Sequence, residues 1–187
     1  MRRKAIAAIC ATVAAAFLAL YLDFALTDTR SLMAAARTQQ VEPYAFYVRM
    51  EHEVSAWGAV PVLTAAQRAA QTLPSGGVTV LESPQRTHVA LTSACAPDLW
   101  TLQGVIRRMR NALGRREAMI CLTGRTQRTD LEQAAREILA ALGDEAQEAL
   151  VQGSLVSLTG ARTQVALRLD GAGARVYIGR PHIPIEY

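Results

Sequence analysis

The pattern of apolar and polar positions predicts a domain in which strands and helices follow one another along the chain. Residues 46–57 alternate, with Phe46, Val48 and Met50 on one face and mostly polar side chains on the other. This period of two is typical of a half-buried strand. Short apolar runs bounded by turn residues predict further strands at 78–81, 87–93, 118–123, 154–159, 163–169 and 174–178.

Three other stretches have the helical period. We expect the first at Thr64–Leu73, with Thr64 as its N-cap, and the second from Pro97 or Asp98 to a C-terminal Gly114. Thr129–Glu132 matches a capping box that opens a third helix, which Gly143 closes. Amphipathic helices can cover one face of an antiparallel sheet. The sequence therefore predicts an α+β two-layer sandwich built from two related β-α-β-β halves.

The N-terminus carries an uncharged stretch of membrane-spanning length. Residues 5–22 contain no charge and follow Arg2, Arg3 and Lys4, and a helix of this length reaches about 27 Å. A signal-anchor that stays in the membrane and a cleaved signal peptide both fit, and either would export the rest of the chain. We expect an anchor or signal at 1–27, a helical stalk at 28–43 and the folded domain at 44–187. The location would be the cell membrane, or outside the cell after cleavage.

Composition excludes several classes of protein. With 51% hydrophobic and 19% charged residues, the chain is not disordered. The net charge is +4, and three of the positive charges lie at the N-terminus, so the remainder is close to neutral and gives little support for a nucleic-acid partner. The sequence has no P-loop and no Gly-x-Ser-x-Gly elbow. We therefore expect no catalytic residues and no cofactor.

Five arginines gather on the second predicted helix and just after it. One interpretation is a weak site for an anionic partner, such as a phosphate-bearing wall polymer, an anionic lipid or nucleic acid. The plainer interpretation is a solvated helix face, with arginine favoured by codon usage. The cluster consists of Arg107, Arg108, Arg110, Arg115 and Arg116.

Cysteine and histidine offer little further chemistry. Cys95 and Cys121 could form a disulfide, closing a loop of about 25 residues and stabilising the fold by about 3 kcal/mol, or could be two buried apolar side chains. Glu51 and Glu53 flank His52, but on a strand the histidine points away from both glutamates. We expect no metal site.

Several segments, most of them in the C-terminal half, resemble those of a known family. The segments that carry it are Gly173-Ala-Arg-Val-Tyr-Ile-Gly-Arg-Pro-His-Ile-Pro-Ile-Glu-Tyr187, Val165-Ala-Leu-Arg-Leu-Asp170, Cys121-Leu-Thr-Gly124, Glu137-Ile-Leu-Ala-Ala-Leu142, Gly153-Ser-Leu-Val-Ser157 and Ser55-Ala-Trp57 with Gly58. Over residues 46–187 the chain resembles the bacterial YwmB family. The resemblance implies a curved sheet like that of the TATA-box-binding protein, export or membrane association, and no assigned catalytic residues.

Together these observations predict an exported, membrane-tethered binding domain at the bacterial cell envelope, acting without catalysis. Its partner would be an anionic envelope polymer or lipid, or another envelope protein. An envelope enzyme with a site formed only in three dimensions is the alternative. The polar face of the first strand mixes Arg49 with Glu51 and Glu53, which disfavours binding of DNA or RNA through the sheet.

Overall fold

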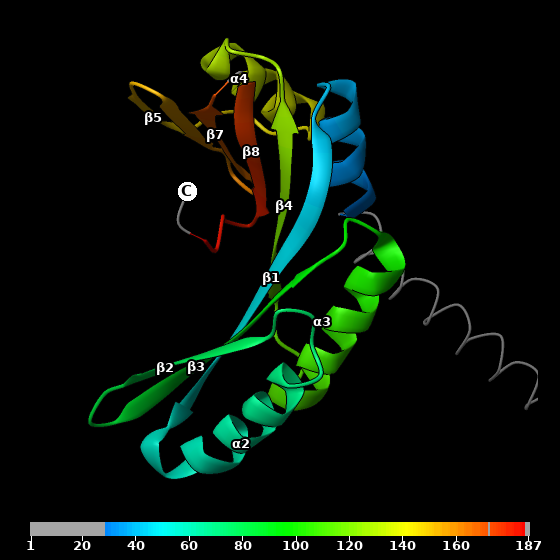
Figure 1. The fold of residues 1–187 in the computed structure, drawn as a ribbon. Helices are drawn as coiled ribbons and strands as arrows, with labels where there is room; N and C mark the ends of the chain where they lie inside the picture. The colour runs from blue at the N-terminus through cyan, green and yellow to red at the C-terminus, as the bar shows by residue number, and fades with distance from the viewer. Residues whose placement is uncertain (1–28, 172, 186–187) are drawn as a thin grey trace, which may run out of the picture.

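The computed structural model describes residues 29–171 and 173–185, which form a sheet with helices packed against it (Figure 1). Residues 29–38 are helical, and twelve elements follow. These are β1 (Glu42–Ser55), η1 (Ala56–Gly58), α2 (Ala59–Ala70), β2 (Gly77–Glu82), β3 (Arg86–Cys95), α3 (Leu99–Leu113), β4 (Ala118–Thr126), α4 (Leu131–Ala141), β5 (Glu148–Gln152), β6 (Leu155–Thr159), β7 (Gln164–Asp170) and β8 (Gly173–Arg180). The predicted α+β class with an antiparallel sheet is confirmed.

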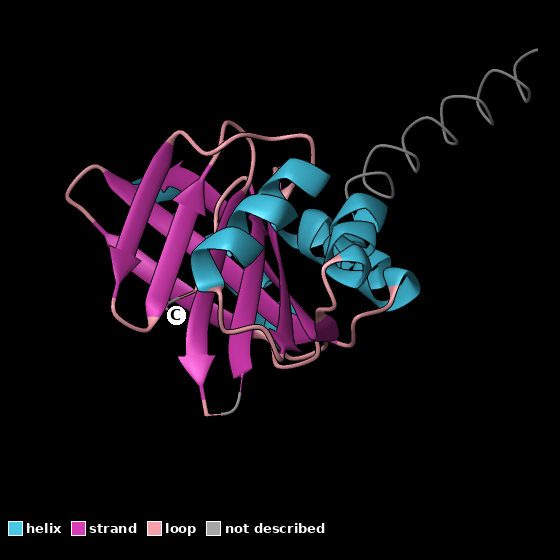
Figure 2. Cartoon of the chain, turned by 90° about the horizontal axis from the view of Figure 1, so that it is seen from above, coloured by secondary structure: helices cyan, strands magenta, loops and turns pink. Residues whose placement is uncertain are grey.

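All eight strands belong to one antiparallel sheet, in the order β2-β3-β1-β4-β8-β7-β6-β5. The first strands of the two halves of the chain, β1 and β4, pair with each other at its middle. Helices α2 and α3 lie beside each other over β1 and β3, whereas α4 packs on β6 and β7. Figure 2 shows from above how the strands turn relative to one another across the sheet, as right-handed strand twist requires.

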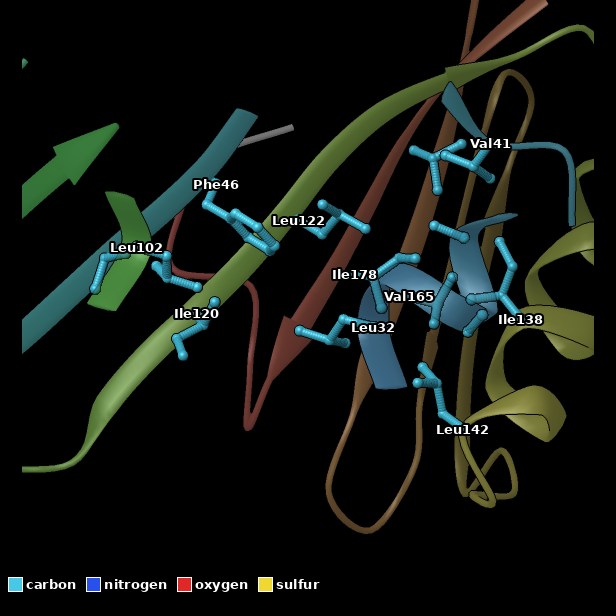
Figure 3. Close-up of a cluster of buried hydrophobic side chains, with 14 of the residues drawn as sticks. Leu32, Val41, Phe46, Leu102, Ile120, Leu122, Ile138, Leu142, Val165 and Ile178 are labelled. Atoms are coloured by element: carbon cyan, nitrogen blue, oxygen red, sulfur yellow. The ribbon is translucent and has the colours of Figure 1, made fainter. Parts of the chain in front are cut away.

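The hydrophobic core lies between the helices and one face of the sheet, which we call the inner face. Phe46, Val48 and Met50 of β1 are completely buried there, as their alternation predicts. Figure 3 shows Phe46 beside Leu122 of β4, with Ile178 of β8 and then Leu32 beyond it in the same core cluster. The opposite face of the sheet, which the helices do not cover, we call the outer face.

The helix at 29–38 belongs to this core, which corrects the expected stalk at 28–43. Leu32, Ala35 and Ala36 are buried in the same cluster as the sheet, and the amide of Val41 donates to the carbonyl oxygen of Ala36 at 2.8 Å. A stalk would leave these apolar side chains in water, whereas packing on the sheet removes them from it.

The predicted membrane segment at 5–22 lies outside the described residues. Within 29–171 and 173–185, no helix combines the length and the apolar character needed to cross a bilayer.

Two helix starts differ from the sequence prediction. The second helix, α2, begins at Ala59 with Gly58 as N-cap, not at Thr64. Pro61 fits its first turn, where a missing N–H breaks no intrahelical bond. The hydroxyl of Thr64 instead donates to the carbonyl oxygen of Val60 at 2.9 Å.

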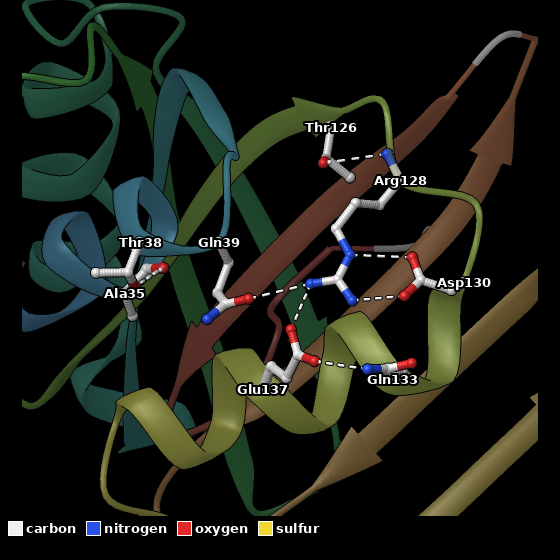
Figure 4. A network of polar contacts seen from close by, with 8 residues as sticks. All are labelled: Ala35, Thr38, Gln39, Thr126, Arg128, Asp130, Gln133 and Glu137. Carbon is white, nitrogen blue, oxygen red and sulfur yellow. Dashed lines mark hydrogen bonds and ion pairs between the residues drawn. The ribbon is translucent and has the colours of Figure 1, made fainter.

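The capping box predicted at Thr129–Glu132 is also wrong. Asp130 is the N-cap of α4, and within the described residues its side chain makes no capping bond. The physical reason is that both carboxylate oxygens of Asp130 accept from the guanidinium of Arg128 (Figure 4). Arg128 also donates to Gln39 and Glu137, and so links the end of the helix at 29–38 to α4.

Candidate functional site

The middle of the outer face is covered by the end of the chain. Cys121, Ala166 and Tyr177 point to the outer face from β4, β7 and β8, and Ile183 and Ile185 pack over them. We call residues 181–185 the C-terminal tail. In Figure 1 this tail lies across the sheet from the helices. It divides the outer face into two open ends.

Two local features hold the C-terminal tail in place. A Cβ atom at Gly179 would come within 2.5 Å of backbone atoms of His182, so this close return of the chain requires glycine. The amide of Ile183 donates to Oε1 of Gln164 at 3.0 Å. The tail is therefore bonded to the sheet as well as packed on it.

One open end of the outer face carries a row of arginines from three neighbouring strands. In the strand register Arg125 of β4 lies opposite Arg175 of β8, and Arg175 lies opposite Arg168 of β7. Opposed residues of antiparallel strands point to the same face. We call these three residues the arginine row. All three side chains are exposed.

Asp170 is the acidic group bonded within the arginine row. Its Oδ2 accepts from Nε of Arg175 at 2.6 Å and from Nη2 of Arg125 at 3.3 Å. The hydrogen bond and the charge of Arg175 lower the pKa of Asp170, and the charges of Arg125 and Arg168 act in the same direction. Arg168 contributes its charge alone: within the described residues its guanidinium forms no hydrogen bond or ion pair.

The other open end, over β1, β3 and β2, is a surface of paired charges. Arg49 is bonded to Glu51, and Glu53 lies against Arg86 and 3.7 Å from Nε2 of His88. Beside these pairs is a shallow depression of about 170 Å³, lined by Arg49, Glu51, Thr79, Leu81, His88, Val89 and Ala90. Glu51 at this depression and Glu42, the residue opposite Arg125, are nine residues apart on β1. At about 3.3 Å per residue, the two ends of the outer face are about 30 Å apart.

Four of the five arginines expected to form an anionic site on α3 and just after it are exposed. Arg107 and Arg108 are exposed and Arg110 is half-buried. Nη1 of Arg108 donates to the carbonyl oxygen of Thr72 at 2.7 Å.

Arg115 and Arg116 follow the helix and are exposed. Nη2 of Arg116 lies 2.9 Å from Nε2 of His52, which is half-buried. The pKa of His52 is lowered, first by burial and then by the positive charge of Arg116. Arg108 and Arg116 are thus each in contact with another part of the protein. Whether the cluster binds an anion stays a prediction.

Cys95 and Cys121 are both free and buried, and the geometry rules out the disulfide considered from the sequence. Cys95 lies opposite Phe46, on the inner face, whereas Cys121 lies opposite Tyr47, on the outer face. Strand β1 runs between them, so the two thiols are separated by a strand and by the thickness of the sheet. Burial raises the pKa of Cys95 to about 11 and that of Cys121 to about 12.

Metal-binding side chains are scattered over the fold. Within 29–171 and 173–185, no three His, Cys, Asp or Glu side chains come together in a way that could hold an ion. The buried polar residues of this region are all serines and threonines: Thr29, Thr87, Ser93, Thr123, Thr126, Ser157 and Thr163.

The arginine row was only partly visible in the sequence. Alternation within the strands predicted at 163–169 and 174–178 assigns Arg168 and Arg175 to a polar face. Arg125, however, lies beyond the strand predicted at 118–123, and the register that aligns all three comes from pairing of distant strands. A prediction that continued the fourth strand to Thr126 would have assigned Arg125 to the polar face as well.

Comparison with known proteins adds little. No protein-family model matches the chain, and no curated protein matches it. Among solved structures, the ligand-free regulatory subunit of aspartate kinase from Thermus thermophilus is similar over 75% of this chain and 85% of that one, at 12% identity and a TM-score of 0.23. A score this low supports no argument about shared fold or function.

Proposed function

We propose that this protein is a membrane-tethered binding domain of the bacterial cell envelope that recognises its partner through the outer face of its sheet and performs no catalysis. The observation that carries the proposal is the form of the outer face. It presents exposed charged side chains at both open ends, on strands that are paired on both sides, and the depression at one of these ends has a volume of only about 170 Å³. Small-molecule sites are usually deeper and enclose most of their ligand.

The N-terminal sequence supports the tether. Residues 5–22 are free of charge behind a basic start, a pattern that favours insertion with the following domain on the far side of the membrane. The segments that resemble the YwmB family support the same location, and they support membership of that family with a sheet like that of the TATA-box-binding protein. The order of elements in each half, a strand, a helix and then a hairpin, is compatible with that fold.

The location is tested by protease treatment of intact cells that express the chain with a C-terminal epitope. External protease should remove the epitope, because the folded domain would lie outside. An epitope that is cut only after lysis, in cells where a known surface protein is cut, would contradict export.

The binding surface is tested by site-specific photocross-linking in living cells. A photoreactive amino acid replaces Leu81 or Gln152, which lie on the outer face at its two ends, or Arg136, which is exposed on α4. We expect a defined adduct from at least one outer-face position and none from the matched helix position. Equal adducts from all three positions, or adducts from Arg136 alone, would overturn the proposal, as would adducts with chromosomal DNA. An envelope enzyme would instead show turnover of wall polymer by the purified chain.

A further inference from the structure

The arginine row places three positive charges side by side on a rigid support. β4, β8 and β7 are neighbouring interior strands of the sheet, and strands lie about 4.8 Å apart. The row is therefore about 10 Å long. All three residues lie within paired strands of the sheet, so their backbones are fixed relative to one another.

This arrangement is unfavourable for the isolated protein. Like charges directly opposite each other on neighbouring strands repel and destabilise the pairing. Asp170 compensates in part, because its Oδ2 is bonded to Arg125 and Arg175. The guanidinium of Arg168 takes no part in these two hydrogen bonds. Glu42 of β1 is exposed and lies opposite Arg125 in the strand register, so the three arginines, Asp170 and Glu42 together carry a net charge of +1.

We propose that the arginine row binds a phosphomonoester group. The proposal rests on the proposed function, since it names the ligand class for the outer face. A phosphomonoester carries a charge of about −1.5 to −2 at neutral pH and presents three terminal oxygens. These oxygens match the three guanidinium groups, whose positive charge exceeds that of Asp170 and Glu42 together. Arginine is suited to this role because its planar donors pair with phosphate oxygens two at a time.

The layout of the outer face favours a small anionic group over a long polyanion. The C-terminal tail covers the centre of the face, and beyond it Glu51 and Glu53 occupy β1. A nucleic acid that extended from the arginine row along the sheet would meet the tail and then two carboxylates. A single phosphate on the row would meet neither.

The test uses the full chain in detergent micelles and follows the side-chain Nε–H signals of the arginines by NMR during titration with methyl phosphate at constant ionic strength. We expect saturable shifts at Arg125, Arg168 and Arg175. Dimethyl phosphate, with one negative charge and two free oxygens, should bind about tenfold more weakly, since it loses one charge-assisted contact. Equal affinity for the two esters, or no saturable shift at the row, would overturn the proposal.

Arg168→Gln is the decisive variant. Because Arg168 is unbonded in the described structure, removing it should leave the urea midpoint unchanged or slightly raised, while methyl phosphate binding weakens about tenfold. Arg68→Gln on α2 removes the same charge from an exposed position outside both arginine clusters and should bind as the parent does. Binding that survives Arg168→Gln, or that weakens equally in Arg68→Gln, would contradict the proposal.

For Asp170→Asn we expect tighter binding of methyl phosphate, the opposite of the effect expected for Arg168→Gln. Removing the competing carboxylate raises the net charge of the three arginines, residue 170 and Glu42 from +1 to +2, so methyl phosphate should bind more tightly than to the parent, by about threefold to tenfold. A purely structural role for Asp170 predicts a lower urea midpoint with no gain in binding, and that outcome would count against the site.

The same NMR measurement in lipid nanodiscs distinguishes a lipid headgroup from a soluble or polymer-borne phosphate as the ligand. Row shifts in phosphatidylcholine discs that contain phosphatidic acid, and not in discs that contain phosphatidylglycerol, would identify a lipid headgroup. Shifts with methyl phosphate alone would identify a soluble or polymer-borne monoester. If methyl phosphate fails to bind while Leu81 or Gln152 still cross-links to a partner, this inference fails and the proposed function stands.

Discussion

Replacing Leu32 by alanine tests whether the helix at 29–38 is part of the domain or a stalk in front of it. Leu32 is 1% exposed and lies in the same core cluster as Val165, Ile138 and Ile178 (Figure 3). The change removes three buried carbon groups, worth about 2.4 kcal/mol in transfer free energy at about 0.8 kcal/mol each. A cavity in the core raises the cost to about 3 kcal/mol. Helix propensity adds nothing, because alanine is the better helix former.

The free energy of unfolding is measured by urea denaturation of the full chain in detergent, followed by circular dichroism at 222 nm. A loss of about 3 kcal/mol corresponds to a fall in Tm of about 6–12 °C for a domain of this size. The control is Leu81→Ala, the same change at a side chain that is 64% exposed, which should cost about 1 kcal/mol or less. If Leu32→Ala proves no more destabilising than Leu81→Ala, residues 29–38 are not part of the cooperative core.

Three further outcomes are expected. Arg128→Met should lower the urea midpoint clearly more than Arg136→Met. The reason is that Arg128 joins two helices, whereas Arg136 makes one exposed pair within α4. Equal midpoints would show that the bonds of Arg128 do not stabilise the fold. The lowered pKa of His52 means that the unfolded chain takes up more protons below about pH 6.5. Stability should therefore fall from pH 7.5 to pH 5.5, and less steeply in His52→Gln; an unchanged slope would contradict the role of burial and Arg116. The thiol of Cys121, whose pKa is about 12, should react with iodoacetamide at pH 8 only after unfolding, and rapid labelling of the native protein would show that the C-terminal tail does not cover it.

Local patterning was sufficient for most of the elements. Helix α3, the second of the predicted helices, has Asp98, one of its two expected first residues, as N-cap and ends before Gly114 as expected. The carboxylate of Asp98 accepts from the amide of Thr101 at 2.8 Å, and Gly114 has φ of 82°. In β1, the alternation of apolar and polar residues correctly identified the buried face. Such features depend on neighbours in the chain, so their signal lies in short stretches of sequence.

Elements supported mainly by distant partners escaped the same analysis. All five residues of β5 are exposed, so burial imposes no period on them, and the strand exists because it pairs with β6. The capping box at Thr129 failed for a different, local reason: the N-cap is Asp130, whose carboxylate is bonded to Arg128, and Glu132 is paired with Arg136.

The amino-acid sequence alone determined the alternation of strands and helices, the α+β class and most of the side chains that enter the core, since each follows from periods of two and 3.6 residues. Only the tertiary structure decided which side chains meet. It set Cys95 and Cys121 on opposite faces of the sheet, and it aligned Arg125, Arg168 and Arg175 across three strands. The physical reason is that strand register between segments far apart in the chain is chosen by burial of the whole sheet, and a shift of one residue would turn each of these side chains to the other face.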